Sequence, residues 1–239
     1  MSTPLYQADP YLAEAEAEVI AHTPEGGVVL DRCLFYATGG GQPGDSGRLV
    51  WEEGALGVAT ALRAGEVIAL VPAAPQALPP VGARVAQHLD WERRHRLMRM
   101  HTALHLLSVV IPLPVSGGQV GEARSRLDFD MPEASEDRET LEAHLNLLVE
   151  RDLPVREEWI TEAALDANPG LVKTMSVAPP RGAGRVRLIR IGEGEGQVDL
   201  QPCGGTHVAR TGEIGALRLG KIEKKGRQNR RVYLHLDGI

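Results

Sequence analysis

Four side chains with metal-binding chemistry occur as two pairs with the same spacing. His101 and His105 stand four residues apart in HTALH, and Cys203 and His207 stand four residues apart in CGGTH. Residues four apart on a helix share one face, with Cβ atoms about 5–6 Å apart. The two glycines inside the second pair favour a tight loop that turns a thiolate and an imidazole toward one point. Three imidazoles and a thiolate suit Zn²⁺ in tetrahedral geometry.

Each pair taken alone also fits an ordinary structural role. Histidines at helical spacing occur often by chance, and a lone intracellular cysteine is usually a buried, inert thiol. Thr102 stands where a HExxH metalloprotease carries its catalytic glutamate, which argues against a protease of that type. Because two such pairs occur in one chain, we expect a single Zn²⁺ ion bound by all four side chains.

The number of zinc ligands bears on what the site does. Four protein ligands close the coordination sphere, as in structural zinc sites, whereas catalytic sites keep one position open for water. His207 is the ligand we question first. Three protein ligands and a zinc-bound water would serve catalysis, and His207 would then act beside the metal as a base or donor. The sequence leaves both arrangements open.

The elements that must position these residues begin with a β-rich segment. Between residues 15 and 90, short apolar runs alternate with stretches rich in glycine and proline, which predicts strands at 17–23, 26–31, 56–62 and 67–72. Short strands with glycine-rich turns are typical of a small β-barrel. A proline cluster then precedes a change of pattern, so we predict an N-terminal β-barrel-like domain over residues 1–88.

Helical spacing begins after Asp90. Asp90 is the predicted N-cap of the helix that carries the histidine pair, and Pro112 is its predicted stop. A second helix is predicted over residues 135–151, capped by Ser135. Its apolar stripe comprises Leu141, Leu145 and Leu148.

Strand patterns surround these two helices. They lie at 123–129, 155–160, 185–191, 197–201, 214–219 and 231–236. Helices interspersed with hairpin-connected strands predict an α+β fold, with helices packed on a mainly antiparallel sheet. We place this second domain at residues 89–239.

The motifs now resemble a known family. HTALH with CGGTHV is similar to the HxxxH…CxxxH signature of the alanyl-tRNA editing domains, found in alanyl-tRNA synthetase and in free-standing AlaX proteins. LFYATGGGQPGDSGRL (34–49) resembles the family's glycine-rich segment, and SRLDFD (125–130) and residues 211–232 are also similar. Fewer than 35 residues precede the glycine-rich segment and the chain ends at Ile239, so it resembles the mid-length free-standing type.

The resemblance implies hydrolysis of the ester that links serine or glycine to the alanine tRNA. Zinc can polarise the ester carbonyl, lower the pKa of a bound water or orient the substrate's α-amino group. The expected catalytic groups are therefore a zinc-bound water and, in the three-ligand arrangement, His207.

Recognition of serine requires a polar group aimed at its hydroxyl. An apolar pocket rejects an added hydroxyl by only about 10²-fold. The candidates are Gln119, Thr102, Thr206 and Gln42. Gln119 lies in SGGQVG between a helix and a strand, where it resembles a polar pocket residue of the synthetase editing domain. A surface amide is the alternative for Gln119, and a brace for the loop is the alternative for Thr206.

The glycine-rich segment also supplies candidate substrate contacts. It is no P-loop, because no Lys-Ser/Thr pair follows the glycines. Consecutive glycines permit close approach of the backbone to a ligand. We expect Gly40, Gly41 and Gln42 to contact the substrate end of the pocket. A plain tight connection between strands is the alternative.

The charge distribution suggests a partner that carries phosphates. The chain has a net charge of −6, yet residues 173–231 contain 13 basic and 5 acidic residues, a surplus of eight positive charges. The predicted tRNA contacts are Lys221, Lys224, Lys225, Arg227 and Arg230. Scattered basic residues on a solvated strand face are the alternative.

Targeting features are not evident. The N-terminus lacks the basic and apolar regions of a signal peptide, no apolar run approaches about 18 residues, and the two cysteines are far apart. We therefore expect a cytoplasmic protein with no membrane partner. Two other functions remain open: a zinc-stabilised RNA-binding module without catalysis, and a metal-dependent hydrolase of small esters on the same scaffold.

Overall fold

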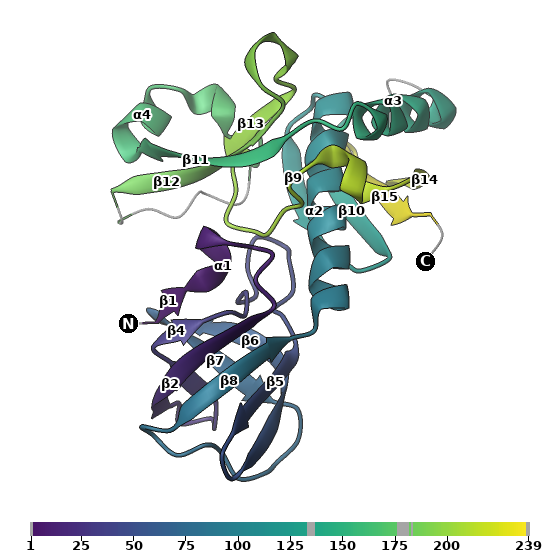
Figure 1. The fold of residues 1–239 in the computed structure, drawn as a ribbon. Helices are drawn as coiled ribbons and strands as arrows, with labels where there is room; N and C mark the ends of the chain where they lie inside the picture. The colour runs from purple at the N-terminus through teal and green to yellow at the C-terminus, as the bar shows by residue number, and fades with distance from the viewer. Residues whose placement is uncertain (1, 133–136, 176–181, 183, 238–239) are drawn as a thin grey trace. The chain divides into compact units, whose positions relative to one another are not determined.

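The chain forms two compact units. The computed structural model describes residues 2–132, 137–175, 182 and 184–237. The units are Met1–Arg96 and Leu97–Ile239, and Figure 1 shows the elements of each. Their division falls within helix α2 (Trp91–Val110), whereas the predicted boundary lies between residues 88 and 89. The functional roles given to the two predicted domains stay predictions.

The first unit contains a closed barrel of six antiparallel strands in the order β2-β3-β7-β6-β5-β8. The barrel strands are β2 (Glu14–His22), β3 (Val28–Leu30), β5 (Gly47–Trp51), β6 (Gly54–Ala64), β7 (Val67–Pro72) and β8 (Arg84–Leu89). The short elements β1 (Thr3–Pro4), α1 (Leu5–Ala8) and β4 (Arg32–Cys33) accompany it. The predicted β-barrel is confirmed.

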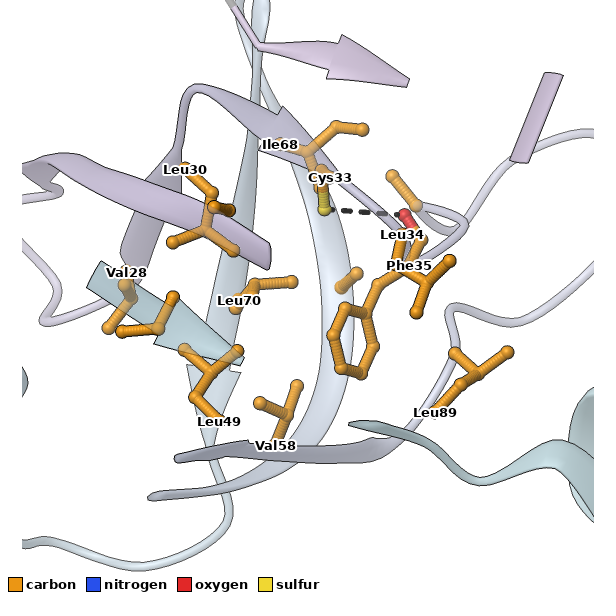
Figure 2. Packing of buried hydrophobic residues seen from close by; sticks show 14 of the residues in the cluster. Val28, Leu30, Cys33, Leu34, Phe35, Leu49, Val58, Ile68, Leu70 and Leu89 are labelled. Carbon is orange, nitrogen blue, oxygen red and sulfur yellow. Dashed lines mark hydrogen bonds between the residues drawn. The ribbon is translucent and has the colours of Figure 1, made fainter. Parts of the chain in front are cut away.

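Alternating side chains fill the barrel. Figure 2 shows Leu30, Leu49 and Leu70 gathered with Phe35 in its core, and all four are fully buried. Cys33 is buried there as well, and its Sγ donates to the carbonyl oxygen of Phe35 at 3.6 Å. Burial raises the pKa of this thiol to about 12, so Cys33 is an inert core residue.

Strand β8 was not predicted, and its composition explains why. Val85, Gln87 and Leu89 point into the barrel, so the inward row contains an amide among apolar residues. The Oε1 atom of Gln87 accepts a hydrogen bond from the backbone N–H of Leu34 at 2.8 Å. A buried polar group is tolerated when it is hydrogen-bonded in this way. Because Gln87 interrupts the apolar row, the sequence of β8 does not show the alternation of a strand.

The second unit is α+β, as predicted. One antiparallel sheet has the order β14-β15-β10-β9 and comprises β9 (Val115–Gln119), β10 (Arg124–Asp130), β14 (Leu217–Lys224) and β15 (Asn229–Leu236). A second antiparallel sheet comprises β11 (Val155–Thr161), β12 (Arg185–Ile191) and β13 (Asp199–Pro202). The helices are α2, α3 (Arg138–Glu150) and α4 (Glu162–Asp166), with 3₁₀ turns at Pro169–Leu171, Gly194–Gly196 and Thr211–Ile214.

Helix α2 has the predicted ends. The backbone N–H of Arg93 donates to Oδ1 of Asp90 at 3.2 Å, which is the hydrogen bond expected of an N-cap aspartate. The helix ends at Val110, two residues before Pro112. Both ends of the helix that carries the histidine pair are therefore confirmed.

Helix α3 starts later than predicted. Ser135 lies outside the described residues, and the N-cap is Asp137, whose side chain accepts hydrogen bonds from the backbone N–H groups of Glu139 and Thr140. A carboxylate at this position also interacts favourably with the positive end of the helix dipole. The buried stripe is Leu141, Leu145 and Val149, so the prediction was wrong in giving Leu148 the third place.

None of the helices in the described part of the chain has the length and hydropathy of a membrane-spanning segment.

Candidate metal centre

The structure brings the two predicted ligand pairs together. His101 and His105 lie one turn apart on α2, and Cys203 and His207 lie in the irregular segment that follows β13. One potential ligand atom from each of these four side chains lies within 4.8 Å of all the others. The three imidazoles are buried and the thiol is half-buried. The predicted loop geometry of the second pair is confirmed.

The distances suit a tetrahedral zinc ion. The Sγ atom of Cys203 lies 3.2 Å from Nε2 of His207 and 3.5 Å from Nε2 of His101. With zinc–nitrogen bonds of about 2.05 Å and zinc–sulfur bonds of about 2.3 Å, a tetrahedral site separates sulfur from nitrogen by roughly 3.6 Å. The donor set therefore fits zinc in both chemistry and spacing.

A buried carboxylate fixes the orientation of His105. Its Nδ1 atom lies 2.9 Å from Oδ2 of Asp199, and Oδ1 of Asp199 accepts from Nζ of Lys173 at 2.6 Å. Because a carboxylate only accepts, Nδ1 of His105 carries the hydrogen and Nε2 is left to face the cluster. Carboxylate–histidine pairs of this kind orient metal-bound imidazoles.

The local charges of this pair favour a cation. Burial alone would raise the pKa of Asp199, but the hydrogen bond from His105 and the charge of Lys173 lower it to about 2. Burial would likewise lower the pKa of His105, but Asp199 and Cys203 raise it to about 9. The negative charges of Asp199, at Nδ1, and of Cys203 therefore favour a proton or a metal ion at Nε2 of His105.

A hydroxyl group fixes the orientation of His207 in a similar way. Thr102 Oγ1 donates to the carbonyl oxygen of Met98 at 2.9 Å and lies 3.2 Å from Nδ1 of His207. Its single hydrogen is committed to Met98, so it accepts from an Nδ1–H of His207. This tautomer leaves the Nε2 lone pair directed at Cys203. Thr102 also accepts from the backbone N–H of Val208 at 3.3 Å.

The remaining protonation states match those of metal ligands. Burial lowers the pKa of His207 to about 3, which keeps its imidazole neutral. Burial opposes ionisation of Cys203, but the electrostatic influence of His101 and His207 outweighs it and holds the pKa of the thiol well below its usual range. A neutral imidazole and a thiolate are the forms that bind a divalent metal.

A buried arginine holds the loop that carries Cys203. Arg187 Nη1 donates to the carbonyl oxygens of Cys203 and Gly205 at 3.0 and 2.9 Å, and its Nε donates to Glu157 at 2.7 Å. The guanidinium thus connects two carbonyl groups of the loop with Glu157 on the adjacent strand β11. Its fork-like geometry allows several such bonds at once.

Four residues that support the centre were not predicted from the sequence: Asp199, Lys173, Gln201 and Arg187. One signal was available, because Asp199, Gln201 and Cys203 alternate along the chain. Alternating residues of a strand point to the same face, and Gln201 Nε2 indeed donates to Asp199 Oδ2 at 2.8 Å. Nothing in the local sequence marks Arg187, whose partners lie 16 to 30 residues away.

Comparisons with known proteins show which family the chain belongs to. Residues 186–233 match the family model described as the threonyl and alanyl tRNA synthetase second additional domain, and residues 11–93 match that of class II (A) tRNA synthetases. The chain is 35% identical over 248 residues to the alanyl-tRNA editing protein AlaX-M of Methanosarcina acetivorans, with 99% of each chain covered. The chain belongs to the AlaX-M family of alanyl-tRNA editing proteins.

Two further relatives differ in how much of their own length the chain covers. The AlaX-M protein of Methanosarcina barkeri is 34% identical, again with 99% of each chain covered. The alanine–tRNA ligase of Pyrobaculum aerophilum is 36% identical over 229 residues. The chain spans 25% of the length of that ligase, so the likeness concerns one region of it.

Several predicted substrate contacts of this AlaX-M family member have other partners in the structure. Gln119 is exposed at the end of β9, not in the predicted loop, and its Oε1 accepts from Nε of Arg126 at 3.3 Å. Thr206 is fully buried beside His207 in sequence. Thr102 is also fully buried and serves His207. The predicted contacts of these three residues with substrate stay predictions.

The glycine-rich segment forms a tight turn in the first unit. Gly39 and Gln42 exchange two backbone hydrogen bonds, of 3.1 and 2.9 Å. Gly40 and Gly41 between them have φ angles of 55° and 82°, a left-handed conformation that glycine adopts without strain. A tight connection between strands was the alternative expected from the sequence. The predicted contact of Gly40, Gly41 and Gln42 with substrate stays a prediction.

The predicted tRNA contacts lie on the β14–β15 hairpin. Lys224, Lys225 and Arg227 are exposed. Lys221 and Lys225 both pair with Glu223, which offsets part of their charge. Arg230 is half-buried and donates to the carbonyl oxygen of Pro132 at 2.9 Å. Contact of these five residues with tRNA stays a prediction.

Proposed function

We propose that this chain hydrolyses the ester bond that joins serine or glycine to the alanine tRNA, at a site built on one Zn²⁺ ion. His101, His105, Cys203 and His207 hold the ion. The observation that carries the proposal is their convergence within 4.8 Å in a chain that belongs to the AlaX-M family of alanyl-tRNA editing proteins. The relatives are alanyl-tRNA editing proteins and alanine–tRNA ligases, which supports an alanyl-tRNA substrate. Serine and glycine as the attached amino acids are what the family resemblance implies.

The metal supplies Lewis-acid polarisation of the ester and a lowered pKa for a water molecule in its vicinity. The protein side chains supply orientation. Asp199 and Thr102 set the tautomers of His105 and His207, so two Nε2 lone pairs are directed at one point before substrate arrives. Such preorganisation lowers the cost of reaching a productive geometry.

His207 has a second proposed role. In the three-ligand arrangement, Nε2 of His207 would face the attacking water as a hydrogen-bond acceptor. Burial lowers the pKa of this imidazole to about 3, so it is neutral at neutral pH but a weak base. Metal content and activity of the His207→Ala variant distinguish this role from that of a fourth ligand.

The tRNA contacts belong to the same proposal. Lys224, Lys225 and Arg227 are exposed on one hairpin, and Lys221 extends this row of positive charges along β14. Contacts with phosphates would position the acceptor stem without reading its sequence. Binding should therefore weaken steeply as salt concentration rises.

The decisive assay uses purified protein with seryl-, glycyl- and alanyl-tRNA(Ala). We expect rapid hydrolysis of the first two, slow hydrolysis of the third, and loss of activity with a zinc chelator. Cys203→Ala should be inactive, while His144→Asn, which changes an exposed histidine of α3, serves as the matched control. Seryl- and glycyl-tRNA that remain intact at saturating zinc would exclude the proposal. Cleavage of serine methyl ester as fast as seryl-tRNA would favour a small-ester hydrolase instead.

A further inference from the structure

Trp159, Arg187 and Cys203 form one row across the three-stranded sheet. Trp159 pairs with Arg187 between β11 and β12, and Leu188 pairs with Pro202 between β12 and β13. The backbone N–H of Cys203 donates to the carbonyl oxygen of Arg187 at 3.2 Å, which continues the second ladder by one residue. Directly opposed residues of neighbouring strands share a face. The indole of Trp159 and the thiol of Cys203 therefore leave the same face of the sheet.

The spacing of strands gives the separation of the two side chains. Neighbouring strands lie about 4.8 Å apart, so the backbones of Trp159 and Cys203 are about 10 Å apart. Asp199 also belongs to this face, because it pairs with Ile191, four residues after Arg187 on β12. The metal centre and the indole thus share one face of the sheet. The distance of about 10 Å between Cys203 and Trp159 is one that a single nucleoside can span.

A chain of polar contacts links the metal-binding loop to the indole. Arg187 holds the carbonyl groups of Cys203 and Gly205, and its Nε donates to Oε2 of Glu157 at 2.7 Å. Oε1 of Glu157 accepts from Nε1 of Trp159 at 3.5 Å. The same guanidinium group therefore influences the position of the loop and, through Glu157, that of the indole.

The indole combines an exposed aromatic surface with a cationic neighbour. Trp159 is 39% exposed, whereas most large apolar side chains in the described part of this unit are buried. The guanidinium carbon of Arg185 lies 5.8 Å from the centre of its ring. An aromatic face next to an arginine is the combination on which unpaired nucleobases stack.

We propose that Trp159 is the stacking surface for the adenine base of the 3′-terminal nucleotide of the charged tRNA. This inference rests on the proposed function, since the ester attacked at the metal centre is carried by the ribose of that nucleotide. The base then lies one nucleoside away from the ester, over the indole, with the positive charge of Arg185 beside it. The unpaired single-stranded end of the tRNA leaves this base free to stack.

Binding of uncharged RNA tests the inference. The probes are an acceptor-stem minihelix that ends in CCA and the same RNA without its terminal adenosine. Loss of one stacked base is expected to weaken binding by about 5- to 150-fold. The wild type should therefore prefer the CCA-ending RNA within this range. Trp159→Ala should bind both RNAs equally, Trp159→Phe should keep most of the preference, and Trp91→Phe, in the other unit, should keep all of it.

Quenching of tryptophan fluorescence gives an independent readout. The chain has three tryptophans, so the quench lost in Trp159→Phe relative to the wild type isolates Trp159. This quench should require the terminal adenosine. A Trp159→Ala variant that retains the full preference for terminal adenosine overturns the inference, as does a wild type that shows no such preference. Neither result depends on hydrolysis, so failure of the deacylation assay would contradict only the proposed function.

Discussion

The Nδ1 atom of His105 lies 2.9 Å from Oδ2 of Asp199, although 94 residues separate them in the chain. The carboxylate also accepts from Lys173 and Gln201, at 2.6 and 2.8 Å. One buried side chain thereby fixes the ring of a candidate metal ligand and is itself held by two donors. Asp199 therefore supports the orientation of His105 from outside the cluster of four potential ligands.

Replacing Asp199 by asparagine should weaken zinc binding by about 10- to 100-fold. The amide is neutral, so it removes the negative charge that favours a cation at Nε2 of His105. Competition with a chromophoric chelator measures the affinity. Asp130→Asn on β10 is the control. A zinc affinity of Asp199→Asn within twofold of the wild type would contradict the role of this carboxylate.

Replacing Thr102 by valine should lower both stability and activity, whereas Thr102→Ser should retain both. Valine has the same shape but leaves the Nδ1–H of His207 and the backbone N–H of Val208 without their acceptor. An unsatisfied buried donor costs about 1–3 kcal/mol of the free energy of unfolding. Urea denaturation and the deacylation rate measure the two effects. Equal behaviour of the valine and serine variants would show that the hydroxyl does not orient His207.

Replacing Arg187 by lysine should reduce zinc affinity and kcat/KM by about tenfold or more. An ammonium group cannot hold two loop carbonyls and Glu157 in the same geometry. Arg190→Lys is a matched control, because Arg190 lies on the same strand and pairs with Glu158. If both variants lost the same amount of activity, the effect would reflect the strand in general and not the loop.

Acid should weaken the β14-β15-β10-β9 sheet through Asp128. Its carboxylate accepts from Arg126 at 2.6 Å and from Arg231 at 2.7 and 2.9 Å. Burial opposes ionisation, but these two arginines outweigh it and lower the pKa of Asp128. A depressed folded-state pKa stabilises the fold above the unfolded value of about 3.9, and this contribution is lost as pH falls through the folded value.

Denaturation in urea at pH 5 and at pH 2.5 measures this contribution. Between the two pH values, the free energy of unfolding should fall more for the wild type than for Asp128→Asn, which has no carboxylate to protonate. An identical fall in both proteins would mean that the ion pairs of Asp128 do not contribute.

The helix ends and most of the strands could be predicted, because cap residues and alternating apolar residues are visible in the local sequence. Asp90 and Pro112 mark the ends of α2, and alternation marked most of the strands. The four candidate metal ligands were predicted because each pair has a short spacing and because both pairs resemble the motifs of one family. Ser135 was a plausible cap, but Asp137 competes two residues later with a charged side chain, and the helix begins there.

Apart from the alternation of Asp199, Gln201 and Cys203, local patterns give no sign of the supporting residues. Asp199 meets Lys173 and His105 only after β13 is placed against α2, and Arg187 meets its loop only through the pairing of β12 with β13. Gln119 looked like a loop residue because its neighbours are glycines, yet pairing with β10 makes the segment a strand. Contacts between residues far apart in the sequence determine the surroundings of Asp199 and Arg187, and pairing with the neighbouring strand determines the place of Gln119.

The most direct test of the account is a zinc titration of metal-depleted protein, followed by the rate of hydrolysis of seryl-tRNA(Ala). We predict that the rate rises linearly with added zinc and reaches its maximum at one equivalent per chain, and that Cys203→Ala shows no such rise. Full activity of the metal-depleted protein, or a rate that zinc does not change, would contradict the claim that His101, His105, Cys203 and His207 form a zinc-dependent deacylation centre.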